Sequence, residues 1–199
     1  MKSIKVLLKS FLGWLYQRLL PFISTPPGTL YKGQYYSFNR VAVIRFHEEH
    51  AKQIHGKVLD VGSGRWTFAR SLLQDHCQYI ATDCFADPNV DIVSDIEELS
   101  NTFGKDDFDF ILCLEVLEHI PHPWLAVKQL HAVLKSGGIL LMTTPFHNRF
   151  HGTNNYRDYW RFTPEGLGLL LDEAGFQKIA VKLSGHHDFP FSIMIEAVK

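Results

Sequence analysis

Cysteine is scarce in this sequence, and acidic residues are missing from its first 47 positions. The three cysteines, Cys77, Cys84 and Cys113, are odd in number and widely spaced. This pattern argues against a disulfide framework and against a paired-cysteine zinc site, and it fits a reducing cytosol. Low-complexity tracts and internal repeats are also lacking, and a net charge of −1 gives no reason to expect a nucleic-acid partner.

The near-neutral total hides a segregation of charge. Residues 1–47 contain no acidic residue and seven basic ones, namely Lys2, Lys5, Lys9, Arg18, Lys32, Arg40 and Arg45. Since the whole chain carries −1 and this stretch carries +7, the remainder carries −8. Such segregation predicts an N-terminal arm that meets an anionic surface, followed by an acidic binding or catalytic body.

A long uninterrupted apolar run is also missing. A membrane-spanning helix needs about 20 such residues, whereas Lys9 and Arg18 interrupt the N-terminal segment, and no cleavage site typical of a secretory signal follows. Residues 1–24 instead fit an amphipathic helix whose apolar side contains Ile4, Leu7, Leu8, Phe11, Leu12, Trp14, Leu15 and Leu19. We expect this helix to lie on the anionic inner face of a membrane, peripheral to it. The alternative is that it packs on the body or on a second subunit.

The chain is long enough for one well-buried domain and a short appendage. Thr25-Pro26-Pro27-Gly28 breaks the first helix, so we divide the sequence into an N-terminal helix at 1–28 and a domain at 29–199. Within that domain, strands are expected at 57–62, 78–83, 90–95, 107–115, 139–145, 177–183 and 191–198, with helices at 66–75, 124–134 and 163–173. This alternation predicts an α/β fold: a doubly wound, mostly parallel, seven-stranded Rossmann-like sheet with helices on both faces.

The stretch VLDVGSGRW, Val58 to Trp66, ends the first of these strands in a glycine loop. It lacks the third glycine of the dinucleotide fingerprint, and Asp60 would repel a pyrophosphate. A carboxylate there suits a cationic ligand, such as an ammonium or a sulfonium. Asp83, Asp95 and Glu115 end the next three strands, so four acidic residues are predicted at one edge of the sheet.

Taken in order, the segments VLDVGSG, ATD, SDIEEL, FDFILCLEVLEHIPHP, LKSGGILLMTTPF and DYWRFTPEGL…AGF resemble the class I S-adenosylmethionine-dependent methyltransferases, in particular a bacterial small-molecule group. The resemblance covers about residues 57–176 and implies S-adenosylmethionine as the cofactor. The cofactor-binding residues that it implies are Asp60, Gly62, Gly64, Asp83, Asp95, Ile96 and Leu114. Trp66 stands where that family usually has another glycine, which is a departure from its pattern.

Glu115, Glu118 and His119 have the spacing i, i+3 and i+4, which would place them on one face of a helix. Similar ExxEH segments bind a divalent ion in some methyltransferases, including quinone-biosynthesis O-methyltransferases and small-RNA 3′-end methyltransferases. Our preferred interpretation assigns no metal and has Glu118 and His119 fix the loop by hydrogen bonding. In the metal interpretation, His147 or His151 would supply the further ligand.

The insert after the fifth expected strand, residues 146–162, should cover the cofactor edge of the sheet. We predict catalytic roles for His151, His147 and His119 and substrate contacts for Arg149, Arg157, Tyr159 and Arg161. Similar inserts occur in methyltransferases associated with surface glycans, which implies a hydroxyl of a glycan or a lipid-linked sugar as the acceptor. The alternatives are a metal-dependent quinone O-methyltransferase and a non-catalytic cofactor-binding scaffold.

Overall fold

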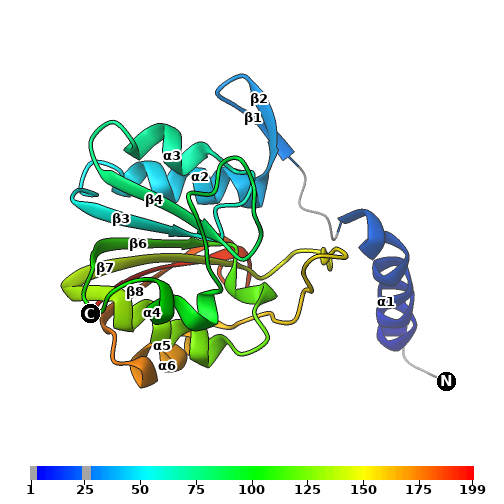
Figure 1. Ribbon diagram of the computed structural model, residues 1–199. Coiled ribbons are helices and arrows are strands. Elements are labelled where there is room, and N and C mark those ends of the chain that lie inside the picture. The colour runs from blue at the N-terminus through cyan, green and yellow to red at the C-terminus, as the bar shows by residue number, and fades with distance from the viewer. Residues whose placement is uncertain (1–3, 24–27) are drawn as a thin grey trace.

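The computed structural model describes residues 4–23 and 28–199 and is shown in Figure 1. The helices are α1 (Ile4–Ile23), α2 (Phe38–His50), α3 (Phe68–Leu73), α4 (Leu99–Thr102), α5 (Pro123–Val133) and α6 (Pro164–Ala174), with 3-10 turns η1 (Ile96–Glu98) and η2 (Leu117–His119). The strands are β1 (Gly28–Tyr31), β2 (Gln34–Ser37), β3 (Lys57–Val61), β4 (Gln78–Asp83), β5 (Ile92–Val93), β6 (Phe108–Leu114), β7 (Leu134–Pro145), β8 (Gln177–His186) and β9 (Phe189–Val198).

The main sheet has seven strands in the order β5-β4-β3-β6-β7-β9-β8. Strands β3 to β7 pair in parallel, whereas β9 runs antiparallel to both of its neighbours. The strand order reverses between β3 and β6, and ligands of doubly wound sheets bind at the carboxyl ends of strands beside such a point. The predicted fold class is therefore confirmed, with the glycine loop at the reversal.

Both faces of the sheet are covered. Helices α2 and α3 lie over one face, and α4, α5 and α6 lie over the other (Figure 1). Successive residues of β3 alternate accordingly: Val58 packs in the cluster that includes Phe46 of α2 and Leu73 of α3, whereas Leu59 packs with Leu130 of α5. This burial on two sides is why the strands are nearly continuous in apolar residues.

Several predicted elements are shorter than expected. The third strand covers only Ile92–Val93, and the helix expected at 66–75 covers Phe68–Leu73. Strand β7 contains an irregularity, because its pairing with β6 shifts register between Phe108 and Phe110. The long helix before the loop, α2, begins at the Ser37 cap, whose hydroxyl accepts from the Arg40 amide at 3.3 Å.

Helix α6 fixes the far end of the insert. Thr163 caps it by accepting a hydrogen bond from the Gly166 amide at 3.1 Å, and Pro164 occupies its first turn. Gly175 ends the helix with φ of 100°, a left-handed conformation that favours glycine. The predicted start and end of this helix are confirmed.

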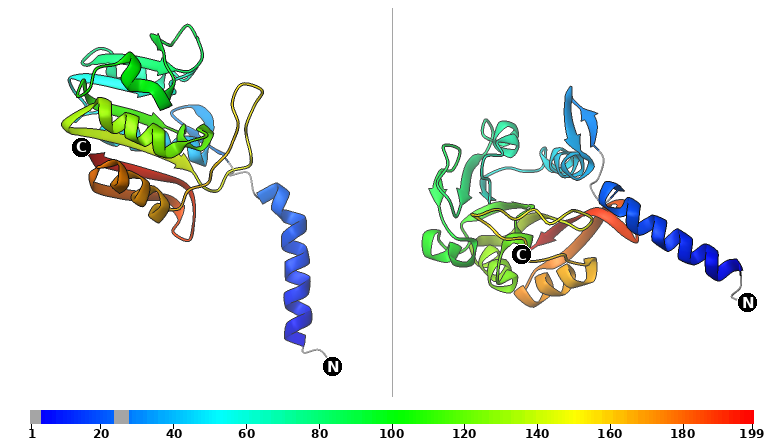
Figure 2. Two further views of the ribbon diagram at one scale, coloured as in Figure 1. Left: turned by 60° about the horizontal axis from the view of Figure 1, so that its bottom comes forward. Right: turned by 90° about the vertical axis from the view of Figure 1, so that its right-hand side faces the viewer.

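Helix α1 projects away from the body, on the side where the insert and the β1–β2 hairpin lie (Figures 1 and 2).

Candidate active site

The loop after β3 is held close to β4 and β6. The amides of Gly62 and Ser63 donate to the Thr82 carbonyl at 2.8 and 3.2 Å. Gly62 has φ of 69°, and a Cβ there would stand 2.4 Å from the Val116 side chain. Glycine is therefore required at this position by both conformation and space.

Asp60 is buried at the base of this loop and accepts a hydrogen bond from the Tyr79 hydroxyl of β4. Burial raises the pKa of Asp60 to about 7, although the Tyr79 hydroxyl and Arg70 oppose the shift. The carboxyl group lines a cavity that Gly62 and Leu114 also line, so three of the predicted cofactor residues meet there.

Helix α2 supplies the wall of this cavity that sequence reasoning missed. Val43 and His47 line it opposite the loop. Both ring nitrogens of His47 are buried without a hydrogen-bond partner in the structure, and burial lowers its pKa to about 4. The ring is therefore neutral at neutral pH. Nothing in the sequence of this segment indicates that it faces the glycine loop, which lies more than ten residues further on.

Trp66 also lines the cavity. The Arg40 guanidinium lies 3.6 Å from the centre of its ring, so the side chain joins the glycine loop to the start of α2. Burial lowers the pKa of Arg40, and the Glu115 carboxyl group opposes that shift. Arg40 thus stands between the loop and the acidic end of β6.

The remaining predicted cofactor residues continue along the same edge. A Cβ at Gly64 would stand 3.5 Å from Asp83 Oδ2, so the loop and the end of β4 adjoin. Asp83 Oδ1 accepts from the Phe85 amide at 3.1 Å. Asp95 is exposed and caps η1 through the Glu97 amide at 2.9 Å, whereas Ile96 is buried in the core.

Glu115 does not lie on a helix, and the expectation that it shares one helical face with Glu118 and His119 is wrong. It has φ of 58°, a left-handed conformation, and its amide donates to the Thr143 carbonyl at 3.0 Å. Its side chain is nevertheless close to Glu118 in space: burial and the Glu118 charge raise the pKa of Glu115 to about 8. The backbone kink at Glu115 therefore keeps its carboxyl group within electrostatic reach of Glu118 without a helix.

Glu118, His119 and His151 form a compact cluster whose carboxylate and imidazole ligand atoms lie within 4.8 Å of one another. The Glu118 side chain has no exposed surface, and neither of its oxygens has a hydrogen-bond partner among the residues that the structure describes. His119 Nε2 is 3.5 Å from Glu118 Oε1, and His151 Nε2 is 3.8 Å from it. The structure thus brings together two of the three predicted catalytic histidines.

The far nitrogen of each imidazole is occupied. His119 Nδ1 lies 2.6 Å from the Arg157 carbonyl oxygen, and His151 Nδ1 lies 3.1 Å from the Arg149 carbonyl oxygen and 3.2 Å from Asp158 Oδ2. These acceptors favour the tautomers that carry hydrogen on Nδ1 and leave a lone pair on Nε2. The nearby Glu118 carboxylate raises the pKa of His151 against the effect of burial.

The insert is tied down over η2. The Tyr159 amide donates to the Glu118 carbonyl at 2.8 Å, and the Trp160 indole donates to the Ile120 carbonyl at 2.8 Å. The Arg161 guanidinium donates one hydrogen bond to each carboxylate oxygen of Asp158, at 2.5 and 2.8 Å. Sequence reasoning missed Asp158, which also accepts from the His151 amide at 2.9 Å.

The other predicted residues of the insert are distributed differently. Arg149, Arg157 and Tyr159 are exposed on its surface, whereas Arg161 is engaged by Asp158. His147 lies away from the cluster, with its ring 4.6 Å from that of Phe189 in β9. His151 and His119 are therefore better placed than His147 for a role at the carboxyl edge.

Comparison with known proteins agrees with this geometry. A family model described as a methyltransferase domain matches residues 15–181. Ubiquinone biosynthesis O-methyltransferase of Erwinia tasmaniensis is 28% identical over 130 residues, which are 57% of this chain and 53% of that protein. The protein of the same name from Pseudomonas aeruginosa is 24% identical over 67% of this chain and 70% of its own length. The chain thus spans about half the length of the first of these curated relatives.

Two solved structures show the same fold. A SAM-dependent methyltransferase from Archaeoglobus fulgidus has a TM-score of 0.63 at 14% identity, covering 81% of this chain and 94% of that one. The Burkholderia thailandensis 1,6-didemethyltoxoflavin-N1-methyltransferase, solved with 1,6-didemethyltoxoflavin and S-adenosylhomocysteine, has a TM-score of 0.64 at 21% identity, covering 81% and 78%.

Proposed function

Because the chain belongs to the methyltransferase-domain family, we propose that it transfers a methyl group from S-adenosylmethionine to a hydroxyl of a glycan or a lipid-linked sugar. The donor would lie across the carboxyl ends of β3 and β4, with Asp60, Gly62 and Gly64 at its methionine end and Asp83 at its ribose. Asp95 and Ile96 would border the adenine, and the Leu114 backbone would lie near the sulfonium.

The reaction is an in-line displacement. The acceptor oxygen attacks the methyl carbon, the bond from that carbon to sulfur breaks, and S-adenosylhomocysteine leaves. The protein mainly supplies alignment and exclusion of water, and a hydroxyl acceptor additionally needs its proton removed. The placement of His151 supports this step most directly: the Arg149 carbonyl at 3.1 Å and Asp158 at 3.2 Å orient the ring through Nδ1, and the Nε2 atom faces the cluster beneath the insert.

Replacement of His151 tests the proposal. With labelled methyl donor and a panel of glycan, lipid-linked sugar and quinol acceptors, His151→Ala should lower turnover by roughly 10²–10⁴-fold, the usual contribution of a general base. Donor affinity should stay nearly unchanged, because the insert lies beyond the glycine loop. His76→Ala, an exposed imidazole just before β4, is the matched control and should keep full turnover. Equal turnover in both variants would show that the insert is structural.

A second candidate, metal-assisted O-methylation of a quinol, is favoured by one observation. The buried Glu118 carboxylate has no hydrogen-bond partner among the described residues, and it faces two imidazoles. Backbone carbonyls hold the Nδ1 atoms of both rings, and the Asp158 carboxylate also lies near that of His151. Such outer partners commonly orient histidines that ligate metals. Under this candidate, chelation should abolish turnover, Mg²⁺ or Mn²⁺ should restore it, and Glu118→Gln should remove the response. Turnover indifferent to chelation would eliminate it.

A further inference from the structure

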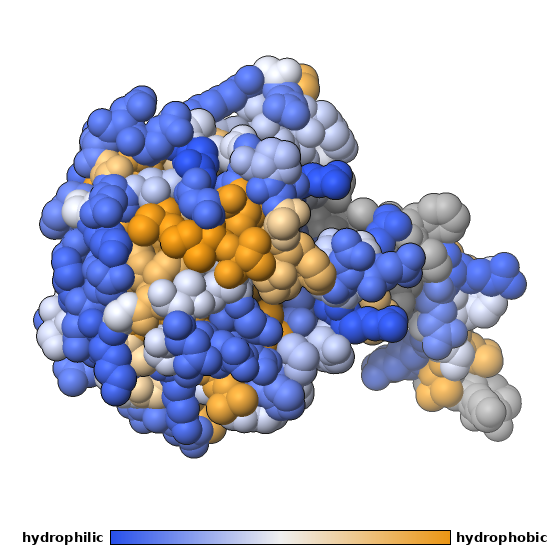
Figure 3. Space-filling view, viewed as in Figure 1, coloured by the Kyte–Doolittle hydropathy of each residue, from blue (hydrophilic) through white to orange (hydrophobic). Residues whose placement is uncertain are grey.

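Helix α1 exposes a continuous apolar side. Most large apolar side chains of that side are exposed, from Ile4 with 83% of its surface accessible to Leu19 with 45%, and Leu15 is half-buried. The exposed residues of the apolar side are Ile4, Leu7, Leu8, Phe11, Leu12, Trp14 and Leu19, whereas Val6 and Tyr16 are exposed on other sides of the helix. Figure 3 shows apolar side chains at the surface of α1 beside hydrophilic ones. An exposed apolar stripe of this size on one helix marks an interaction surface.

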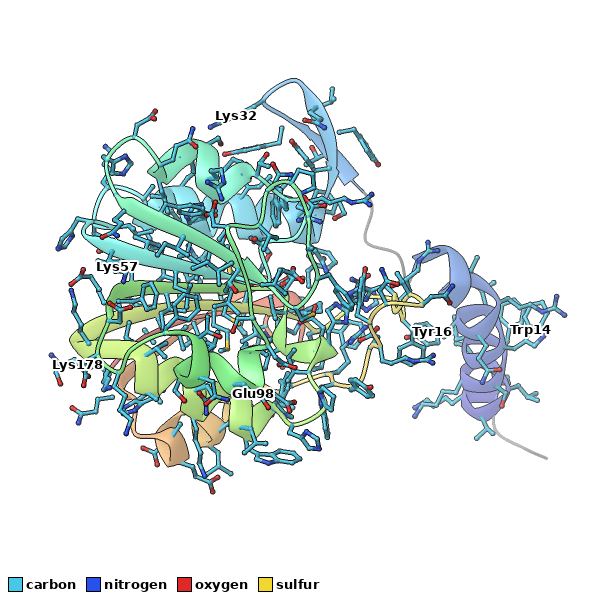
Figure 4. The ribbon with its side chains drawn as sticks, in the orientation of Figure 1. Trp14, Tyr16, Lys32, Lys57, Glu98 and Lys178 are labelled. Carbon is cyan, nitrogen blue, oxygen red and sulfur yellow. The ribbon has the colours of Figure 1, made fainter. Side chains whose placement is uncertain are left out.

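The polar side of the same helix is basic. Lys5 and Lys9 lie on it, and residues 1–47 contain no acidic residue. The Arg18 guanidinium lies 5.3 Å from the ring centre of Trp14, so its stem follows the aromatic ring. Trp14 and Tyr16 project from opposite sides of α1 (Figure 4). Aromatic residues and long basic side chains together suit the boundary between lipid headgroups and acyl chains.

The position of α1 relative to the body matters as much as its composition. It leaves the body beside the insert and the β1–β2 hairpin (Figures 1 and 2). On that side Phe150 of the insert has 87% of its surface exposed, and Leu30 of β1 has 73%. A flat surface that holds α1 would therefore face the insert that covers the candidate active site.

We propose that α1 lies in the headgroup region of an anionic lipid bilayer, with its apolar side toward the acyl chains and Lys5 and Lys9 toward lipid phosphates. Among the described residues, no helix is long and apolar enough to cross a membrane. Each basic residue near an anionic surface adds electrostatic attraction, which burial of the apolar side reinforces. The proposal extends the proposed function but can be measured without any methyl acceptor.

Vesicle flotation of the full chain tests it. With vesicles that contain phosphatidylglycerol, the protein should float at low salt and sediment at high salt, and it should bind phosphatidylcholine vesicles far less. Lys5→Glu with Lys9→Glu should weaken binding by at least about tenfold. Leu8→Asp with Leu12→Asp should abolish it. Lys128→Glu with Lys178→Glu, on exposed positions of the body, is the control and should float like the parent protein.

Two outcomes would overturn the proposal. In the first, the parent protein fails to float with any of the vesicles and is a dimer that Leu8→Asp with Leu12→Asp converts to a monomer. This result would assign the apolar side to contact with a second copy. Equal flotation of the parent and the lysine variants would show that lipid charge is not what α1 recognises. Circular dichroism of each variant verifies that the body remains folded.

Discussion

At Asp60, burial opposes the charge that a cationic ligand needs. The pKa of this carboxyl group is raised to about 7, whereas an exposed aspartate titrates near 3.8. The group's contribution to folding stability is thus complete below about pH 4 and is lost as the pH rises to about 7. A bound ammonium or sulfonium would favour the ionised form and so compensate for this loss at neutral pH.

The pH dependence of donor binding follows from this residue. Affinity for S-adenosylmethionine should fall as the pH drops below about 7, approaching tenfold per pH unit, because binding must then release the Asp60 proton. It should level off at higher pH. Calorimetry at several pH values measures the midpoint.

Tyr79→Phe removes the hydroxyl that stabilises the ionised carboxylate, so the midpoint should move upward. Tyr16→Phe on α1 should leave it in place. An affinity independent of pH across both sides of neutrality would contradict the assignment of Asp60 to the cofactor site.

Among the structural elements, the insert is held in shape by the Asp158 side chain, and the surrounding sequence does not indicate this role. Burial opposes ionisation of Asp158, but the Arg161 guanidinium and the His151 amide outweigh it and hold its pKa at about 2. The carboxylate thereby joins the two ends of the loop that presents His151. Removing it would leave Arg161 without its partner inside the insert.

Hydrogen exchange can test this role of Asp158. In Asp158→Ala, amides of residues 147–162 should lose protection, whereas those of β3 and β6 should not, because the insert is the element that the carboxylate joins. Asp172→Ala on exposed α6 is the control and should exchange like the parent protein. Unchanged protection of the insert in Asp158→Ala would show that its contacts with Glu118 and Ile120 suffice to hold it.

The elements that could be predicted are those whose signal is local. The alternation of apolar strands and helices is enough to predict β3, β4 and β6. The Thr163 cap and Gly175 are enough to predict where α6 begins and ends. The kink at Glu115 and the contact between His119 and His151 could not be predicted, since they depend on how the insert returns to η2. The same holds for His47, which reaches the glycine loop only through the packing of α2.

For the whole molecule, charge and structure divide at different places. Of the basic N-terminal stretch, residues 1–47, α1 projects from the body, whereas Lys32, Arg40 and Arg45 belong to the β1–β2 connection and to α2, which packs on the acidic remainder. Four acidic residues, Asp60, Asp83, Asp95 and Glu115, lie at or just beyond the carboxyl ends of β3, β4, β5 and β6, and Asp60 and Glu115 are on the two strands between which the order reverses. An edge built this way suits a cationic cofactor and disfavours a pyrophosphate.

Calorimetric titration of the full chain with S-adenosylmethionine, S-adenosylhomocysteine and NAD measures whether this edge binds the expected cofactor. We expect the first two to bind with a dissociation constant on the order of micromolar and NAD not to bind. Asp83→Ala should lose about 1–3 kcal/mol of binding free energy, because ribose hydroxyls would lack a partner, and Asp172→Ala should bind like the parent protein. Heat from NAD alone, or equal affinity in Asp83→Ala and the parent protein, would show that the edge does not bind S-adenosylmethionine in this way.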